Sequence, residues 1–230
     1  MVSVCIPTYN GEKYIKEQID SILQQLDEND EIIISDDSST DATIDIIRAF
    51  NDPRIKLLLD NHFNSPIFNL ENALKHASGD FIFLSDQDDV WKINKVSVMK
   101  RYLKQYTCVV SDAEIVNENL IVINPSYFNL RNCKKGLMRN IIRNSYIGCC
   151  MAFNRSILKY VLPFPKEIPM HDVWIGLISE KYGNSIFIND ALIKYRRHGK
   201  NASQTGEKSK YSLRMKLKMR INIIIALIKR

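Results

Sequence analysis

The chain has 230 residues, of which 45% are hydrophobic and 25% are charged, a composition that is typical of a folded globular protein and excludes an intrinsically disordered chain. The formal net charge of +6 is unevenly distributed, because residues 208–230 contain eight basic residues and no acidic residue. The first 207 residues contain 24 basic and 26 acidic residues, so the body is not built to bind a polyanion and we expect no nucleic-acid partner.

Five cysteines are present, an odd number, and none of them has Cys-x-x-Cys spacing. Most lie in apolar stretches, which predicts free, reduced thiols rather than a disulfide framework or a zinc site. The sequence shows no basic-then-apolar leader and no apolar run of bilayer-spanning length. We therefore expect a cytoplasmic protein.

Strands and helices alternate in the first half of the sequence. Strands are predicted at 2–6, 31–35, 55–59 and 81–84, with helices over 12–26, 42–50 and 67–77 between them. This alternation predicts an α/β fold with a doubly wound, mostly parallel sheet, in which ligands bind beyond the carboxyl ends of the strands.

The second half of the sequence is less regular. Helices are predicted over about 92–105, near 155–161 and from His171 onward, and strands over about 107–111, 114–123, 148–153, 185–188 and 191–195. The segment 125–147 is mixed and basic, so we assign it no element.

Three carboxylates directly follow the apolar run 81–84, at Asp86, Asp88 and Asp89. Carboxylates this close together repel one another and resist desolvation, so a fold keeps them where a cation neutralises them. Strand alternation would place Asp86 and Asp88 on one face, where they suit a hard divalent cation such as Mg²⁺ or Mn²⁺. The alternative is a solvated acidic turn. No glycine-rich phosphate-binding motif is present, so the metal would have to hold the phosphate.

Three other polar segments are candidates for the same site. The pair Asp36-Asp37 reads equally well as helix-capping acids or as an acceptor for the N–H of a pyrimidine base. Asp172, after His171, is either an N-cap or a general base tuned by an apolar pocket. His198 is either a plain histidine or a third metal ligand.

The basic tail carries an apolar stripe at helical spacing, formed by Leu213, Leu217, Ile221, Ile224 and Ile228. A basic amphipathic helix can lie in an anionic membrane surface, which is the partner that we expect for residues 208–230. The alternative is a helix that packs on the body or on a partner protein.

Several short motifs together resemble those of one enzyme family. The segments 4–11, 34–41 and 85–91 resemble the family 2 glycosyltransferases of the GT-A fold, and the segments 148–155, 171–174 and 195–199 look like the rhamnosyltransferase-like branch of that family. The resemblance covers residues 2–200, with the motifs in the family's order.

The resemblance implies a role for particular residues. Pro7 and Tyr9 would line the pocket for the nucleotide base, and Asp37 would bind that base. Asp86 and Asp88 would be the DxD motif, which contacts the ribose, the metal and the diphosphate, and His198 would complete the metal site. Asp172 would be the catalytic base that takes up the proton. The chain departs from the family pattern at Ser38, where glycine is common, and in 63–70, which lacks the basic residue often found there.

The implied activity is that of an inverting glycosyltransferase that uses Mn²⁺ or Mg²⁺. It would move a sugar of the rhamnose, galactose or glucose class from a nucleotide-diphosphate donor to a hydroxyl of a lipid-linked saccharide, in the synthesis of a bacterial surface polysaccharide such as O-antigen. Residues 1–207 would form one catalytic domain, with a donor half over about 1–110 and an acceptor half over about 111–207. The enzyme would sit peripherally at the inner face of the cell membrane.

Two other classes of protein are compatible with parts of the pattern. A metal-dependent nucleotidyltransferase also uses clustered aspartates, but it needs a basic clamp near its first strand, and Pro7–Gly11 contains no Lys or Arg. A non-catalytic membrane-binding module would need only the basic tail. The full set of aspartates and a candidate base argue against that module.

Overall fold

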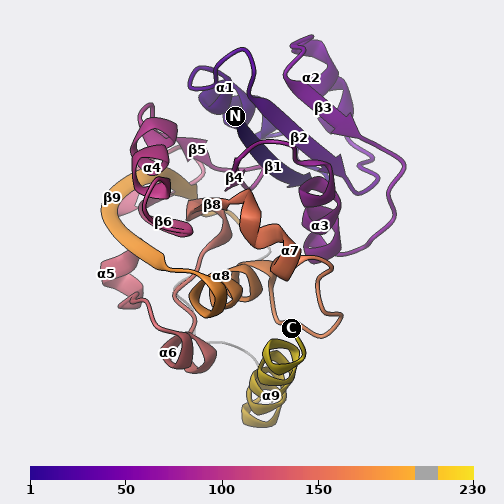
Figure 1. Cartoon of the computed structure of the whole chain (residues 1–230). Helices are drawn as coiled ribbons and strands as arrows, with labels where there is room; N and C mark the ends of the chain where they lie inside the picture. The colour runs from indigo at the N-terminus through magenta and orange to yellow at the C-terminus, as the bar shows by residue number, and fades with distance from the viewer. Residues whose placement is uncertain (200–211) are drawn as a thin grey trace.

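The computed structural model describes residues 1–199 and 212–230 (Figure 1). The elements are β1 (Val2–Thr8), α1 (Ile15–Leu23), β2 (Glu31–Asp36), α2 (Thr43–Ala49), β3 (Ile55–Leu58), α3 (Pro66–His76), β4 (Phe81–Leu84), β5 (Val90–Trp91), α4 (Lys95–Leu103), β6 (Cys108–Val116), β7 (Val122–Asn124), α5 (Tyr127–Arg131), α6 (Leu137–Ile142), β8 (Met151–Asn154), α7 (Leu158–Val161), α8 (His171–Tyr182), β9 (Ser185–Arg196) and α9 (Leu213–Lys229). The expected boundary between body and tail, and Lys208 and Lys210 of the tail, lie outside the described residues.

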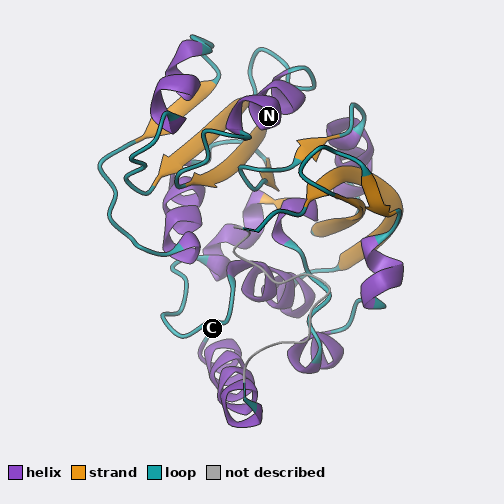
Figure 2. Cartoon of the chain, turned by 180° about the vertical axis from the view of Figure 1, so that it is seen from behind, coloured by secondary structure: helices purple, strands orange, loops and turns teal. Residues whose placement is uncertain are grey.

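The described strands form one sheet in the order β3-β2-β1-β4-β8-β6-β9-β5, with β7 paired to β6. Strand β1 runs parallel to β2 and β4, and β2 runs parallel to β3, so the predicted α/β fold with a parallel first half is confirmed. Strand β8 pairs antiparallel with both β4 and β6, and thereby joins the two halves of the sheet. Figure 2 shows the same sheet and its surrounding helices viewed from behind.

The parallel half forms where the sequence contains continuous apolar runs. Ile32, Ile33 and Ile34 of β2 are all fully buried, as expected of a parallel strand with both faces covered. The helical spacing that predicts α1 corresponds to its buried face, which includes Ile15 and Ile19. The predicted range of α1 is three residues too wide at each end, that of α2 is one residue too wide at each end, and that of α3 is shifted by one residue, within the usual uncertainty of helix ends for α2 and α3.

The second half differs from the prediction in several places. The strands expected over 107–111 and 114–123 are the long strand β6 and the short strand β7, and the unassigned segment 125–147 contains α5 and α6. Val90 and Trp91 form β5 against β9, so the helix expected from residue 92 begins at Lys95. The two short strands expected over 185–195 are one strand, β9, with a register shift opposite Ser111–Asp112. The segment 148–150 is a 3₁₀ turn that leads into β8. These pairings join distant segments, which local periodicity does not report.

Helix α8 is a core helix of the second half. It is buried on nearly all sides, and Trp174, Ile175 and Leu177 are fully inaccessible to solvent. Helices α6, α7 and α9 pack against it. The described cysteines carry free thiols, and four of the five are buried, as predicted.

Helix α9 packs on the body through a face other than the predicted apolar stripe. Ile223 and Leu227 are its buried residues. The stripe itself is exposed, at Leu213, Leu217, Ile221, Ile224 and Ile228. Within residues 1–199 and 212–230, no helix combines the length and the apolar character needed to cross a bilayer. One side of the tail helix thus rests on the protein, and the stripe lies open.

We predict that Gly176→Ala destabilises the protein. A Cβ at this position in α8 would overlap the ring of Tyr146, which is 1% exposed and is held by a 2.9 Å hydrogen bond from its hydroxyl to Glu180. Overpacking costs about 1–3 kcal/mol, which exceeds the roughly 1 kcal/mol that alanine contributes as a better helix former. The measurement is urea unfolding. The same change in a Tyr146→Leu background should cost less, and a gain in stability from Gly176→Ala alone would contradict the prediction.

Candidate active site

A cleft of about 1130 Å³ opens beyond the carboxyl ends of β1, β2 and β4. Its lining includes all the residues that the sequence selects for the site: Pro7, Tyr9, Asp37, Asp86, Asp88, Asp172 and His198. This is the edge of a parallel sheet at which ligands bind in α/β folds. The fold therefore brings the three polar loops and the two later motifs to one place.

The acidic cluster lies in a turn rather than in a strand. Strand β4 ends at Leu84, and residues 86–89 connect it to β5. Asp86 and Asp88 line the cleft, whereas Asp89 is fully buried and accepts the backbone N–H of Arg196 at 2.8 Å. The expected alternation along a strand is therefore not what places Asp86 and Asp88 on the same side.

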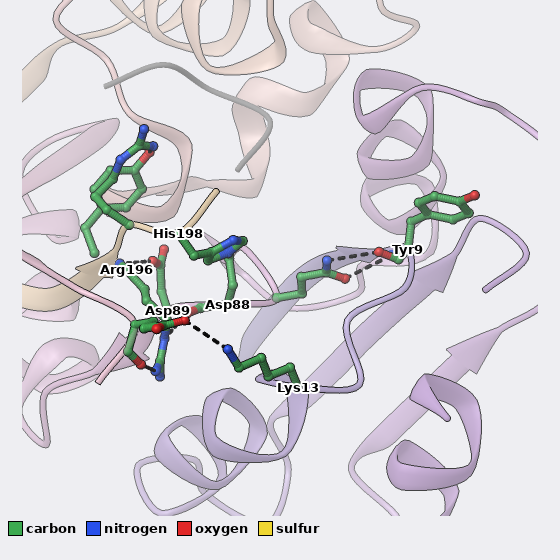
Figure 3. A network of polar contacts seen from close by, with 10 residues as sticks. Tyr9, Lys13, Asp88, Asp89, Arg196 and His198 are labelled. Carbon is green, nitrogen blue, oxygen red and sulfur yellow. Dashed lines mark hydrogen bonds and ion pairs between the residues drawn. The ribbon is translucent and has the colours of Figure 1, made fainter. Parts of the chain in front are cut away.

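His198 is in direct contact with the acidic turn. Its Nε2 lies 2.7 Å from Oδ2 of Asp88 (Figure 3). Its ring stacks on that of Tyr14, with the centroids 4.9 Å apart. The structure therefore places His198 beside Asp88, and the metal-ligand role of His198 stays a prediction.

Arg196 fixes the same turn from behind. Its Nε donates to the carbonyl of Asp88 at 2.7 Å, its Nη1 donates to the carbonyl of Glu118 at 2.6 Å, and its Nη2 pairs with the carboxylate of Glu17. The guanidinium also lies over the ring of Tyr14, at 4.6 Å. One buried side chain thereby joins β9, the acidic turn, α1 and the β6–β7 hairpin (Figure 3).

Burial and the charges of neighbouring carboxylates raise the pKa values of Asp86 and Asp89 in the turn. Burial, followed by the charges of Asp88 and Asp172, raises the pKa of Asp86 to about 7. Burial and the charges of Asp88 and Asp86 also raise the pKa of Asp89 well above its ordinary value. The ammonium of the fully buried Lys95 lowers the pKa of Asp86 and so offsets part of this repulsion. The remaining negative charge favours a bound cation.

The residues present fit a divalent metal ion. Asp86 and Asp88 offer carboxylate oxygens and His198 offers an imidazole nitrogen, a donor set that suits Mn²⁺ and is compatible with Mg²⁺. Among the described residues, the group of three whose ligand atoms all lie within 4.8 Å of one another is Asp86, Asp89 and Cys149, whereas the predicted set has one direct contact, between Asp88 and His198. Within the described part of the chain, Oδ2 of Asp89 is buried and makes no hydrogen bond that meets the usual geometry, so a ligand could satisfy it.

The two aspartates after β2 have different surroundings. Asp36 is buried and closes the turn, accepting hydrogen bonds from the hydroxyl of Thr8 and from the N–H and hydroxyl of Ser39. Asp37 lines the cleft and accepts the backbone N–H groups of Phe63 and Ser65, at 2.6 and 3.2 Å. Neither is the N-cap of α2, which is Ala42. A carboxylate has about four acceptor sites, so Asp37 retains the capacity to bind a ligand.

Tyr9 is tied to the acidic turn by Gln87. The Oε1 of Gln87 accepts the N–H of Tyr9 at 2.9 Å, and its Nε2 donates to the carbonyl of Tyr9 at 3.0 Å. The Tyr9 side chain is 56% exposed at the cleft, beside Pro7 of β1. An exposed aromatic ring held by its own backbone is suited to stack on a planar ligand.

Asp172 lies in the first turn of α8 and lines the same cleft as these loops. The N-cap of the helix is Met170, so the alternative reading of Asp172 as the N-cap is wrong. Its Oδ1 accepts the N–H of Val173 at 2.6 Å. Burial raises the pKa of Asp172 to about 7, opposed by this hydrogen bond, and burial lowers the pKa of His171 to about 4. A carboxyl with a pKa near neutrality in a cleft is suited to exchange protons.

Three residues that support the site carry only a weak signal in the sequence. Gln87 is hidden inside the acidic motif, and Lys95 appears as one more charge at the start of a helix. Arg196 appears as a basic residue at a strand end. Their roles depend on contacts across the sheet, such as the 2.5 Å hydrogen bond from Lys95 Nζ to the carbonyl of Cys149, which no local pattern predicts.

The fold and the cleft define an α/β protein with paired carboxylates at the ligand-binding edge of its parallel strands and a candidate base in the same cleft. The model of the family "Glycosyl transferase family 2" matches residues 3–162. The chain belongs to that family.

Two curated relatives and one solved structure illustrate the likeness. The chain is 30% identical over 203 residues to the Escherichia coli UDP-Glc:alpha-D-GlcNAc-diphosphoundecaprenol beta-1,3-glucosyltransferase WfgD, covering 85% of this chain and 77% of WfgD. It is 36% identical over 127 residues to the Shigella flexneri dTDP-rhamnosyl transferase RfbG, covering 52% of this chain and 42% of RfbG. The crystal structure of S. aureus TarS 1-349 in complex with UDP-GlcNAc superposes with a TM-score of 0.75 at 21% identity, covering 99% of this chain and 66% of that one. This likeness shows that the GT-A fold is shared.

We predict that the wild-type protein binds Mn²⁺ and that Asp88→Ala weakens this binding at least about tenfold, because the substitution removes a ligand and the partner of His198. Isothermal titration calorimetry with Mn²⁺ alone measures the affinity. Glu118→Gln is the control, because Glu118 is also a cleft carboxylate but has no place in the donor set. Equal losses in the two variants would mean that the cleft attracts cations only through its overall charge.

Proposed function

We propose that this protein is an inverting glycosyltransferase that moves a sugar from a nucleotide-diphosphate donor to a hydroxyl group of a lipid-linked saccharide in bacterial polysaccharide synthesis. The observation that carries the proposal is that Asp172 shares one cleft with Asp86 and Asp88, close enough for its charge to raise the pKa of Asp86. A candidate base and a candidate diphosphate site within one cleft suit transfer between two bound substrates.

The donor binds in the half formed by the loops after β1, β2 and β4. Tyr9 and Pro7 line the base pocket, and Asp37 accepts the N–H of the base, which favours a pyrimidine nucleotide. The names of WfgD and RfbG, which specify UDP-glucose and dTDP-rhamnose chemistry, support this choice. We place glucose, rhamnose and galactose among the candidate sugars.

Asp86, Asp88 and His198 would hold Mn²⁺ or Mg²⁺, which when bound supplies a positive charge to the departing diphosphate. The protein contributes the placement of these ligands, since Arg196 and Gln87 fix the turn that carries both aspartates. Lys95 holds the turn from the core side and keeps part of its charge compensated.

Asp172 acts as the general base. Its Oδ1 is held by the N–H of Val173, so its Oδ2 accepts the proton of the acceptor hydroxyl. The acceptor oxygen attacks the anomeric carbon from the face opposite the diphosphate, and the bond from that carbon to the diphosphate breaks, with its electron pair leaving on the diphosphate. A single displacement of this kind inverts the configuration of the anomeric carbon.

The acceptor is attached to a lipid, so the enzyme would work at the inner face of the cell membrane as a peripheral protein. The diphosphoundecaprenol acceptor in the name of WfgD supports a lipid-linked substrate. The basic tail, residues 208–230, supports attachment to an anionic membrane surface.

The proposed function is tested by measuring donor hydrolysis over a panel of UDP-, dTDP- and GDP-sugars, with and without EDTA. We expect one pyrimidine nucleotide sugar to be hydrolysed, and hydrolysis to stop with EDTA and resume with Mn²⁺ or Mg²⁺. Failure to turn over any donor would favour a binding protein, and activity that ignores EDTA would remove the metal from the proposal.

We predict that Asp172→Asn lowers kcat for transfer by roughly 10²–10⁴, the usual contribution of a general base. Asparagine keeps the size of the side chain and can accept the N–H of Val173, but it cannot take the acceptor's proton. The KM for the donor should change little, because the donor ligands are untouched. Transfer at the wild-type rate by this variant would rule out Asp172 as the base.

We also predict that kcat/KM falls as the pH drops below about 7. Burial raises the pKa of Asp172 to about 7, and the base works only when ionised, so each further unit of acidification should cost about tenfold. A bound cation nearby would shift this fall in kcat/KM to lower pH. The measurement is a pH–rate profile from pH 5 to 9, and the residual activity of Asp172→Asn should lack the acid limb if Asp172 is its origin.

A further inference from the structure

Helices α6 and α9 present a group of exposed apolar side chains. The two helices lie side by side at the lower edge of the molecule, in contact with one another (Figures 1 and 2). On α6, Met138 and Ile142 are 68% and 61% exposed. On α9 the exposed residues are Leu213, Met215, Leu217, Ile221, Ile224, Ile225 and Ile228. Side chains of this size seldom remain exposed in such number without a partner.

The same two segments are strongly basic. Residues 131–143 contain five Lys or Arg residues and residues 212–230 contain six, and neither segment contains an Asp or Glu. Among these basic residues, Lys134, Lys135 and Arg143 beside α6 and Arg214, Lys218 and Lys229 on α9 are exposed. Apolar and cationic side chains are thus both exposed on these two neighbouring segments.

Helix α9 is held on the body in a fixed orientation. Arg220 donates to the carbonyl of Ile142 at 2.7 Å, and Lys181 of α8 donates to the carbonyl of Leu227 at 2.5 Å. Ile223 and Leu227 are buried in this contact, so the apolar stripe cannot turn inward without breaking it. Packing therefore leaves the stripe outside and sets it beside the exposed residues of α6.

We infer that α6 and α9 form a single docking face for the anionic surface of a lipid bilayer, and that both helices are required. Apolar side chains at the acyl boundary together with Lys and Arg at the headgroups are the combination that holds an interfacial helix. The charge of the face matches a bilayer that contains acidic lipids. The membrane contact proposed for residues 208–230 therefore also includes α6, a segment for which the sequence predicts no element.

The position of this face relates it to binding of the lipid-linked acceptor, and this step rests on the proposed function. A hollow of about 330 Å³ lies between α9 and the loop 167–169. That loop leads directly to Met170 and Asp172 at the cleft. The face is therefore next to the side of the cleft at which a lipid-linked acceptor would meet the base.

The test is co-sedimentation of the full chain with vesicles, without donor or acceptor. We expect the wild type to bind vesicles of phosphatidylcholine and phosphatidylglycerol in equal parts, and not vesicles of phosphatidylcholine alone. Met138→Ser with Ile142→Ser on α6, and Leu217→Ser with Ile221→Ser on α9, should each weaken binding roughly tenfold or more. Ile93→Ser, at an equally exposed isoleucine beside α4, is the control and should bind as the wild type does.

Unchanged binding by the α6 variant would overturn the two-helix face, and no binding by the wild type would overturn membrane docking altogether. Analytical ultracentrifugation of the same proteins detects the rival occupant: a dimer that both variants abolish would assign the face to a second copy of the chain. Donor hydrolysis without lipid, measured in parallel, should be equal in all variants. Because that assay needs no vesicle, failure of the proposed function and failure of docking give different results.

Discussion

The carboxylates of the turn after β4 repel one another, and the rest of the site depends on how the protein compensates this repulsion. Asp86, Asp88 and Asp89 lie within four residues, and the protein compensates them from three directions. Lys95 approaches from the core, the backbone N–H of Arg196 approaches from β9, and His198 approaches from the cleft. Strand β9 supplies the Arg196 N–H, and His198 follows two residues after the end of that strand, so the second half of the chain completes the surroundings of a turn that belongs to the first half.

Much of the fold can be predicted from the sequence, because the first half is built from local patterns. The run Ile32–Ile34 and the helical spacing of α1 report burial directly, and the strand ends are marked by polar loops. The second half is held together by pairings between distant residues, such as Val90 with Lys194. Those pairings carry no periodic signal, which is why β5 and the full length of β9 are absent from the prediction.

The site residues of the first half are easier to predict from the sequence than those of the second half. Asp37, Asp86 and Asp88 follow predicted strands, so topology alone brings them to one edge. Asp172 and His198 come from the irregular half, and only the resemblance to a family joins them to that edge. The environment of each residue could not be predicted. Whether Asp36 or Asp37 faces the cleft, and how far burial raises the pKa of Asp172, depends on contacts that exist only in the folded chain.

The two hydrogen bonds between Gln87 and the backbone of Tyr9 limit which substitutions could change the nucleotide that this protein accepts. Gln87 lies between Asp86 and Asp88, so the surface that would recognise the base and the turn that would hold the metal move as one unit. Substitutions that reshape the base pocket by shifting the Tyr9 backbone would also displace both aspartates. A change of nucleotide is therefore more accessible through side chains, at Asp37 or in the loop after β3, than through the backbone of the first loop.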